Sequence, residues 1–351
     1  MVVLENLLSG QTKRLSESES MLSFRRRGCM PSGALSSKPA QRTSGKEKVM
    51  HFLRSKKMIR NWDLYVLILP VLVFYIIFCY GPMYGLQLAF KDYVAIDGIF
   101  GSPWVGLKHF KRFFDSPYFL RLISNTLSIS VLQLLFGFPI PIILALLINE
   151  VENSRRKKLV QNVTYVPHFL STVVIVGMLK NFVHPEYGII NMMIAKLGGS
   201  RVNFMEEASW FYTLYVASGV WQNMGWDSII FIAALSGVDP QLHESAKIDG
   251  AGRMQRIWHI NMPAILPTIV IVLILNVGGL MNIGFEKAFL MQNDLNLSRS
   301  DIISTYSYRL GIQGAQYSYA TATGFFNSII NFILLVTVNN ISRRVSSTSL
   351  W

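Results

Sequence analysis

The sequence has little cysteine and little charge. Its 351 residues include two cysteines, Cys29 and Cys79, which excludes a small scaffold held together by several disulfide bonds. Asp, Glu, Lys and Arg make up 15% of the residues, whereas soluble proteins contain about 25%. A folded protein in water needs a charged coat, and this chain has few charges with which to provide one.

Hydrophobic residues account for 51% of the chain. This content excludes disorder as the main state, because disordered chains are poor in apolar residues. Many apolar residues together with few charges predict an integral membrane protein, in which lipid replaces water around the apolar side chains.

The net charge of +13 is concentrated near the N-terminus. Residues 1–58 are rich in Ser, Lys and Arg, and we predict that they form a basic, disordered cytoplasmic tail. No apolar run follows Arg25–Arg27, which argues against a signal peptide. The tail also lacks the interleaved aromatic residues of a nucleic-acid-binding domain, so no nucleic-acid partner is expected.

Six stretches are apolar and long enough for a transmembrane helix, which needs about 20 residues. Prolines fall within the second and third stretches, so these two are predicted to be kinked and packed against other helices. The sequence therefore predicts an all-α integral membrane protein with six transmembrane helices. They cover residues 62–83, 122–148, 159–182, 210–235, 265–283 and 319–341.

The distribution of Lys and Arg predicts the orientation of these spans. Basic residues are denser in the segments that are internal when the N-terminus is cytoplasmic, including Arg155–Lys158 and Arg343–Arg344. Short cytoplasmic segments of membrane proteins carry an excess of Lys and Arg. The predicted topology is therefore N-in/C-in.

The connection between the fourth and fifth spans, residues 239–263, is predicted to fold as a helix, a turn and a second amphipathic helix. Asp239 is a good N-cap and Pro240 suits the first helical position, so a short helix should run to about Asp249. Gly250 then ends it. An interfacial helix that only anchors the fifth span is the alternative, but it would not need the small residues that flank a carboxylate here.

This connection resembles the EAA loop of binding-protein-dependent ABC importer permeases. The family pattern is Glu-Ala-Ala, three residues, Gly, nine residues, Ile, one residue and Leu-Pro. All spacings agree in this sequence, with Ser and Met as mild departures. The matching residues are Glu244-Ser245-Ala246, Gly250, Ile260 and Met262-Pro263. Trp221–Trp226, Gly284–Leu290 and Ser304–Tyr306 are similar to permeases that serve oligosaccharides such as aldouronates or alginate fragments.

The resemblance implies a type I ABC importer permease fold for residues 59–345 and a place in the prokaryotic plasma (inner) membrane. It implies four kinds of partner: a second homologous permease subunit, two ATP-binding-cassette subunits, an external solute-binding protein and a carbohydrate. By the same resemblance, the loop couples transport to the ATPase through Glu244, Ser245, Ala246, Asp249, Gly250, Ala251, Ile260 and Pro263.

The chain has no sequence signature of an enzyme. No G-x-x-x-x-G-K-[ST] loop occurs, and the nearest fragment, Ser44–Glu47, lacks the first glycine and the hydroxyl. His168, His184 and His259 share no metal-ligand spacing. We expect no metal or cofactor in this chain, because ATP and Mg²⁺ would bind to the partner ATPase.

Polar residues within the spans are costly and are candidates for a substrate pathway. Carboxylates and amides can bind sugar hydroxyls, and an indole face can stack on a sugar. The candidates are Trp221, Asn223, Trp226, Asp227, Asn276, Glu286 and Asn327. The alternatives are a satisfied contact between helices for Asp227, helix packing for the asparagines, and an ion pair with Lys287 for Glu286. Trp210, Tyr212 and Tyr215 are predicted to form an interfacial aromatic belt.

Two other functions stay open at this point. The same architecture could import a different solute, such as a peptide or an anion. A secondary transporter driven by an ion gradient is a further alternative, although it would not need an EAA-type loop.

The sequence offers two later start codons, and the true start of translation can be tested. If translation begins at Met50 or Met58, just before the first apolar stretch, N-terminal sequencing of the expressed protein will begin at one of these residues. Recovery of residues 1–49 would contradict the later start and support a translated basic tail.

Overall fold

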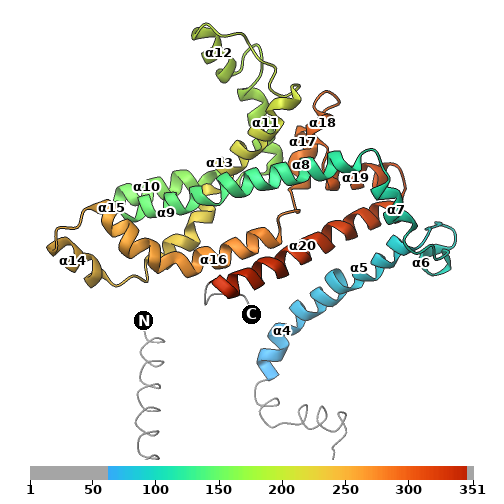
Figure 1. Ribbon diagram of the computed structural model, residues 1–351, viewed down its shortest axis with the longest axis horizontal. Coiled ribbons are helices and arrows are strands. Elements are labelled where there is room, and N and C mark those ends of the chain that lie inside the picture. Colours follow the sequence, from blue (N-terminus) through green and yellow to red (C-terminus); the bar gives the residue numbers. More distant parts are fainter. Residues whose placement is uncertain (1–61, 346–351) are drawn as a thin grey trace, which may run out of the picture. The chain divides into compact units, whose positions relative to one another are not determined.

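The computed structural model describes residues 62–345 and divides the chain into two units, residues 1–72 and 73–351. All regular structure in residues 62–345 is helical apart from one isolated bridge between Lys91 and Trp104 (Figure 1). The all-α prediction is therefore confirmed for this part of the chain. The predicted tail lies outside the described residues, as do the alternative starts.

Four helical stretches within the described residues are long and apolar enough to cross a membrane. The first, Trp62–Phe90, consists of α4 (Trp62–Phe74), η1 (Tyr75–Tyr80), α5 (Gly81–Met83) and η2 (Tyr84–Phe90). The second, Phe119–Asn149, consists of α8 (Phe119–Leu132), η3 (Gln133–Gly137) and α9 (Pro139–Asn149). The third contains α15 (Arg253–Arg256), η6 (Ile257–Asn261) and α16 (Met262–Gly278), and the fourth is α20 (Tyr317–Val345).

Two more helical segments occupy the remaining predicted spans. The predicted third span consists of α10 (Ser154–Tyr165), η4 (Val166–Phe169) and α11 (Thr172–Phe182). The predicted fourth span is α13 (Phe211–Leu235), a helix of 25 residues that is more polar than the four long apolar stretches. Shorter helices connect these segments. They are α6 (Gly98–Gly101), α7 (Lys108–Phe114), α12 (Ile189–Lys196), η5 (Ala208–Trp210), α14 (Pro240–Ile248), α17 (Phe285–Met291), α18 (Leu297–Ser300), α19 (Ile303–Tyr308) and η7 (Arg309–Gln313).

Proline affects the second and third predicted spans differently. The third bends by 102° between η4 and α11, close to Pro167, so the predicted kink is confirmed there. Proline lacks a backbone N–H and restricts the residue before it, which favours a break. In the second, Pro139 and Pro141 lie in the first turn of α9, where their missing N–H groups are tolerated. A π-helical segment precedes them, and the helical stretch continues.

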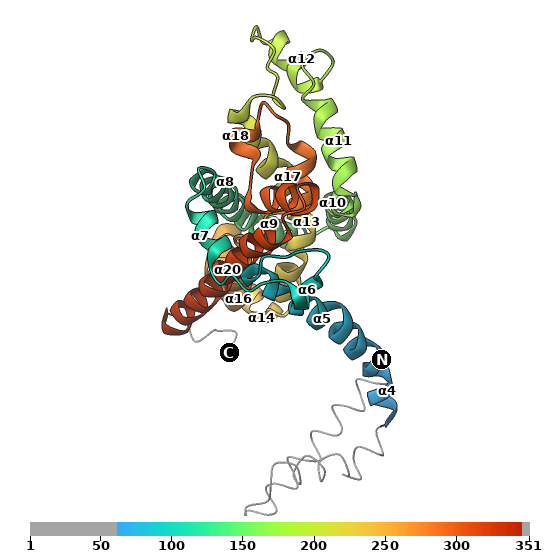
Figure 2. The same cartoon turned by 90° about the vertical axis from the view of Figure 1, so that its right-hand side faces the viewer.

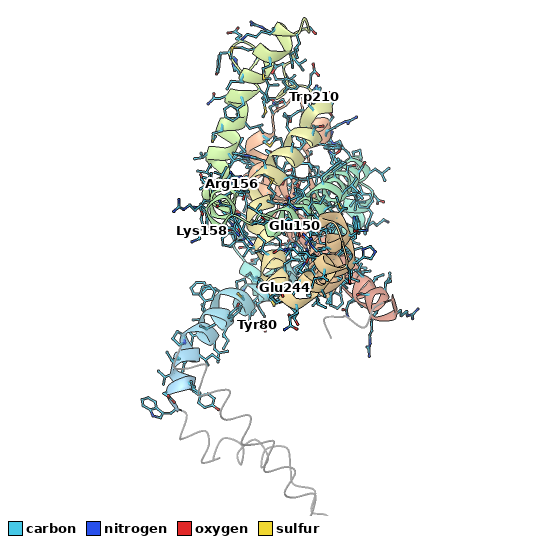
Figure 3. The ribbon with its side chains drawn as sticks, turned by 90° about the vertical axis from the view of Figure 1, so that its left-hand side faces the viewer. Tyr80, Glu150, Arg156, Lys158, Trp210 and Glu244 are labelled. Carbon is cyan, nitrogen blue, oxygen red and sulfur yellow. The ribbon has the colours of Figure 1, made fainter. Side chains whose placement is uncertain are left out.

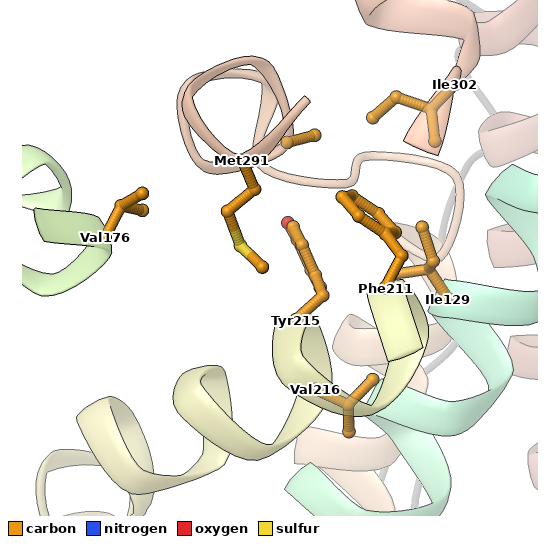
Figure 4. Packing of buried hydrophobic residues seen from close by; sticks show 8 residues of the cluster. Ile129, Val176, Phe211, Tyr215, Val216, Met291 and Ile302 are labelled. Carbon is orange, nitrogen blue, oxygen red and sulfur yellow. The ribbon is translucent and has the colours of Figure 1, made fainter. Parts of the chain in front are cut away.

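Helix α13 packs against many of the other helices of the second unit. It contacts α8, η3, α9, α10, α11 and α16. One apolar cluster joins α8, α11, α13 and α17 (Figure 4). A second cluster, built around Phe231 and Ile265, joins α9, α13 and α16. Figure 2 shows α13 among these helices, with α20 alongside α16.

A buried carboxylate fixes the segment that contains α17, α18 and α19. Asp301 is fully buried, and its Oδ2 accepts from Arg121 at 3.1 Å and from Arg309 at 2.7 Å. Asn125 of α8 donates to the backbone carbonyl of Asp301 at 2.8 Å. Buried charges are stable only when they are paired and hydrogen-bonded. This network therefore ties the segment to α8 and helps to position α17.

The close approach of α10 and α13 depends on Gly225. A Cβ atom at this position would lie 2.1 Å from the carbonyl oxygen of Thr164. We expect Gly225→Ala to lower the thermal unfolding temperature of the purified protein, because the clash costs about 1–3 kcal/mol. The matched control is Gly324→Ala in α20, where a Cβ has no heavy atom within 4 Å. Alanine there should be neutral or slightly stabilising. Equal unfolding temperatures for the two variants would contradict the prediction.

Candidate functional site

A cavity of about 810 Å³ lies between the η3 region, α13 and the segment from α16 to α17. This volume is within the range of ligand pockets, about 300–1,000 Å³. Apolar side chains form much of its wall. The polar side chains in the wall are Ser130, Gln133, Thr172, Gln222, Asn223, Asp227, Asn276, Asn282 and Lys287.

Four of the predicted substrate-pathway residues line this cavity: Asn223, Trp226, Asp227 and Asn276. Asn223 donates to the carbonyl of Gly219 at 3.0 Å, and its Oδ1 lies 2.9 Å from Nδ1 of His168. The carboxylate of Asp227 forms no hydrogen bond or ion pair with another described side chain, although it lies within electrostatic reach of His168. Its carboxylate is therefore available to a ligand.

The other three predicted residues do not line the cavity. Trp221 is 41% exposed and lies outside the lining, as does Glu286, which is exposed. Asn327 donates to Oδ1 of Asn282 at 3.2 Å, and Asn331 donates to the same atom at 2.9 Å. Asn327 therefore packs α20 against the connection between α16 and α17, as the packing alternative predicts.

His168, which was not among the predicted pathway residues, contacts two of the residues that line the cavity. Its imidazole stacks on the indole of Trp226 with ring centroids 4.5 Å apart and an interplanar angle of 5°. Together with its contact to Asn223, this stacking fixes one face of Trp226 and leaves the indole 44% exposed. The Pro167-His168 pair in the middle of an apolar stretch was the available signal.

Lys287 was not among the predicted substrate-pathway residues, although it was expected, together with Glu286, to gate the cavity, to meet the solute-binding protein or to form an ion pair with that glutamate. The two residues form no ion pair in the described part of the chain. Lys287 is 7% exposed and lines the cavity, and its Nζ donates to the carbonyl of Tyr215 at 2.8 Å. Tyr215 itself is buried and donates to the carbonyl of Gly284 at 3.3 Å, so its place in an aromatic belt was wrongly predicted.

The predicted coupling loop folds as a helix, a turn and a helix. Asp239 accepts from the backbone N–H of Gln241 at 2.9 Å and caps α14. Gly250 has a φ of +78° and ends the helix. The backbone N–H of Ala251 donates to the carbonyl of Ala246 at 2.8 Å, and that of Gly250 donates to Lys247 at 3.1 Å. This bond pair is the Schellman ending that glycine favours.

Helix α14 has no buried residue, and most of its residues are exposed. Glu244, Ser245, Asp249 and Gly250 are exposed, whereas Ala246 and Ala251 are half-buried. Exposed apolar side chains accompany them, including Ile248, Met254 and Trp258, which are 86%, 65% and 59% exposed. Such a patch is typical of a surface that contacts another protein. Glu244 lies at the end of the unit that also holds Arg156 and Lys158 of α10 (Figure 3).

The second helix of the loop is continuous with α16 through the π-helical η6, which contains Ile260; Pro263 lies in the first turn of α16. It is also attached to α9. Glu150, at the end of α9, accepts from Arg256 and from Asn261, both at 3.4 Å. Arg256 and Glu150 are 11% and 16% exposed, and Arg256 also donates to the carbonyl of Ala251 at 3.3 Å. The loop is therefore joined to two helices that border the cavity.

Comparisons with known proteins give consistent results. Residues 137–347 match the family described as the binding-protein-dependent transport system inner membrane component. The chain is 44% identical to Protein LplB of Bacillus subtilis (strain 168) over 83% of its length and 92% of the relative. It is 42% identical to the polygalacturonan/rhamnogalacturonan transport system permease protein YteP of the same organism, over 84% and 92%.

The fold is similar to that of a solved bacterial transporter. The matching chain belongs to a bacterial alginate ABC transporter in complex with an alginate pentasaccharide-bound periplasmic protein. The two chains are 42% identical and superpose with a TM-score of 0.78, over 85% of this chain and all of the other.

The link between Glu150 and Arg256 predicts that Glu150 stabilises the loop, whereas the exposed Glu152 does not. Glu150→Gln keeps the side-chain shape but removes the charge, and it should speed amide hydrogen exchange in residues 251–261 by about tenfold, because a largely buried charged hydrogen bond is weakened. Glu152→Gln is the matched control, since Glu152 pairs with Arg253 at 3.7 Å on the exposed surface. Exposed pairs contribute little, so exchange should stay unchanged. Equal exchange in both variants would contradict a role for Glu150 in holding the loop.

Proposed function

Since the chain belongs to the family of binding-protein-dependent transport system inner membrane components, we propose that it is the transmembrane subunit of an ATP-driven importer of an oligosaccharide or sugar. The sugar assignment is supported by the relatives, which include a polygalacturonan/rhamnogalacturonan permease and an alginate transporter. The chain is a transport subunit and not an enzyme. ATP is hydrolysed by a separate subunit.

One observation carries this proposal: the EAA-like loop joins an exposed helix directly to the wall of the cavity. The loop presents Glu244 on α14, and its second helix runs without interruption into α16. Residues of α16, including Asn276, line the cavity. A device that couples an external motor to a transport path needs this connection.

The coupling mechanism follows from the stiffness of the loop. When two ATPase subunits close on ATP, α14 would move with the surface that holds it, as a rigid body. Glu244 would pair with a basic residue of the ATPase, and the small residues beside it would allow close contact. Through η6 and the contact between Arg256 and Glu150, the movement would reach α16 and α9 together. A relative shift of these two helices against α13 would open or close the cavity.

The cavity has the chemistry that a sugar requires. Asn223, Asn276 and Asp227 can exchange hydrogen bonds with hydroxyl groups, and the exposed indole of Trp226 can stack on the apolar face of a pyranose ring. Stacking of His168 on Trp226 holds that indole in place. A solute-binding protein would deliver the sugar to the opposite side of the membrane from α14.

The assembled transporter would contain this chain, a second homologous permease, two ATP-binding-cassette subunits and the solute-binding protein, in the plasma (inner) membrane of a prokaryote. Residues 59–345 would form the permease domain with six transmembrane helices, the bent pair α10–α11 being the third and α13 the fourth. The N-in/C-in orientation is supported by the location of the α14 end beside the basic start of α10 (Figure 1). A carrier driven by an ion gradient or specific for another solute is not favoured by these relatives.

Two substitutions in α14 test the coupling role. In the transporter reconstituted with its partners, Glu244→Lys should abolish ATP-driven uptake, because it places like charges at the contact with the ATPase. Gly250→Pro should do the same, because proline cannot adopt a φ of +78°. Both variants should stay in the membrane at normal levels. The measurements are uptake and substrate-stimulated ATPase activity.

The matched control is Glu152→Lys, a charge reversal on an exposed carboxylate that does not belong to α14. It should retain most of the uptake. Normal substrate-stimulated ATPase activity in Glu244→Lys, or an equal loss of activity in Glu152→Lys, would contradict the proposed role of the loop. Uptake that continues after ATP depletion at a constant ion gradient would contradict an ATP-driven importer.

A further inference from the structure

The cavity contains a lysine that has no counter-ion in the described part of the chain. Lys287 of α17 is 7% exposed, and none of the ion pairs among the described residues includes it. Its Nζ donates one hydrogen bond, to the carbonyl of Tyr215 at 2.8 Å, and lies 4.7 Å from the centre of the Tyr215 ring. An ammonium group has three donors, so two remain for a ligand.

A second polar side chain in the same wall also lacks a partner. Gln133, in the π-helical η3, lines the cavity; its side-chain amide forms no hydrogen bond with any described residue, and its Oε1 is buried. Oxygen and nitrogen of a glutamine amide are assigned from their hydrogen bonds, so the amide can present its NH₂ group to a ligand. Buried polar groups are normally paired, and an unpaired one in a cavity wall indicates a missing partner.

Gly219 of α13 brings these two groups together. A Cβ atom at Gly219 would lie 3.1 Å from Oε1 of Gln133 and 3.2 Å from Nζ of Lys287. The two polar atoms are therefore at most about 6 Å apart. One ligand group can accept a hydrogen bond from each at such a separation, because each bond spans about 2.8 Å. Glycine leaves this space free.

The charges in the cavity are separated along α13. Gly219 and Asp227 are eight positions apart in the sequence, which corresponds to about 12 Å along a helix. Asn223 lies between them, one turn from Gly219, and contacts His168. The wall therefore offers a cationic point near α17 and an uncharged amide, followed by a carboxylate near Trp226.

We propose that Lys287 and Gln133 form a carboxylate-binding subsite beside Gly219, so that the transported oligosaccharide carries uronate groups. The inference rests on the proposed function and names the class of its substrate. A single cation and one amide match a group with one negative charge. A phosphate monoester carries almost two charges and would be left partly unpaired here.

The order of groups along α13 also sets the orientation of the sugar. With one carboxylate on Lys287, the neighbouring hydroxyls face Asn223, and the carboxylate of Asp227 accepts from hydroxyls further along. An acidic group beside Asp227 would be repelled. Burial lowers the pKa of Lys287, which lies outside the long apolar stretches, to about 7. A bound carboxylate favours the charged form of the amine and restores its pKa.

The test uses the transporter reconstituted with its partners and two probes, tetragalacturonate and its fully methyl-esterified, uncharged form. Lys287→Gln should lower uptake of the acid by about tenfold or more, as expected for a lost hydrogen bond to a charged group, and should change uptake of the ester by less than twofold. Lys287→Arg should restore most of the uptake of the acid. The matched control is Lys180→Gln, on the exposed surface of α11, which should leave both unchanged.

Equal losses for both probes in Lys287→Gln would overturn the proposal, because they would indicate a structural role. Uptake of the acid that is unaffected by the substitution would overturn it too, as would a wild-type protein that imports only the ester. Absence of ATP-dependent uptake of either probe by the wild type would instead count against the proposed function. A second measurement then decides the subsite independently of transport. Tetragalacturonate, but not the ester, should slow acetylation of Lys287 followed by mass spectrometry; equal rates would overturn the subsite.

Discussion

A helix that carries Gln222, Asn223 and Asp227 cannot face lipid, and the packing of the second unit follows from this constraint. The polar helix α13 packs against α8, α9, α10 and α16. This packing is incomplete on one side, where the polar face of α13 borders the cavity. The same requirement that buries α13 therefore leaves a cavity with polar side chains within an apolar bundle. Gly225 permits the tight contact of this helix with α10.

The site and the coupling loop are connected through the ends of helices. Helix α16 starts in the loop and ends at the glycine-rich turn before α17, so one continuous element touches both the α14 surface and the cavity. The buried network around Asp301 holds the segment after α17 against α8. Consequently one part of the cavity wall, near α17, is anchored to α8, whereas another part, α16, is attached to the loop. In the proposed coupling, a displacement of α14 would change the cavity because the wall near α17 would stay fixed.

Features that depend on neighbouring residues in the sequence could be predicted, whereas features that depend on tertiary contacts could not. Asp239, Pro240 and Gly250 act through their own backbone, so the bounds of α14 could be read within one residue. The hydrophobic stretches were likewise recognisable, and the kink in the third was predicted from its proline, but not its angle of 102°, since η4 also packs against α13. Lys287 illustrates the limit. Its neighbour in the sequence is Glu286, yet helical geometry directs adjacent side chains to different faces, and the lysine meets Tyr215, which is 72 positions away. Tyr215 was misassigned for the same reason. An aromatic belt is predicted from composition, whereas the burial of a side chain depends on tertiary contacts that composition does not reveal.

The N-cap and the C-terminal glycine of α14 have a thermodynamic consequence. Its first turn is capped by Asp239, its last is closed by Gly250, and the residues that follow are held by Glu150. The segment is thus ordered by its own chain before any other subunit arrives. Association with a partner loses less conformational entropy when the docking element is already rigid, so more of the contact energy appears as affinity. A small exposed helix can in this way provide a durable joint between two proteins, even though the area that it offers is modest.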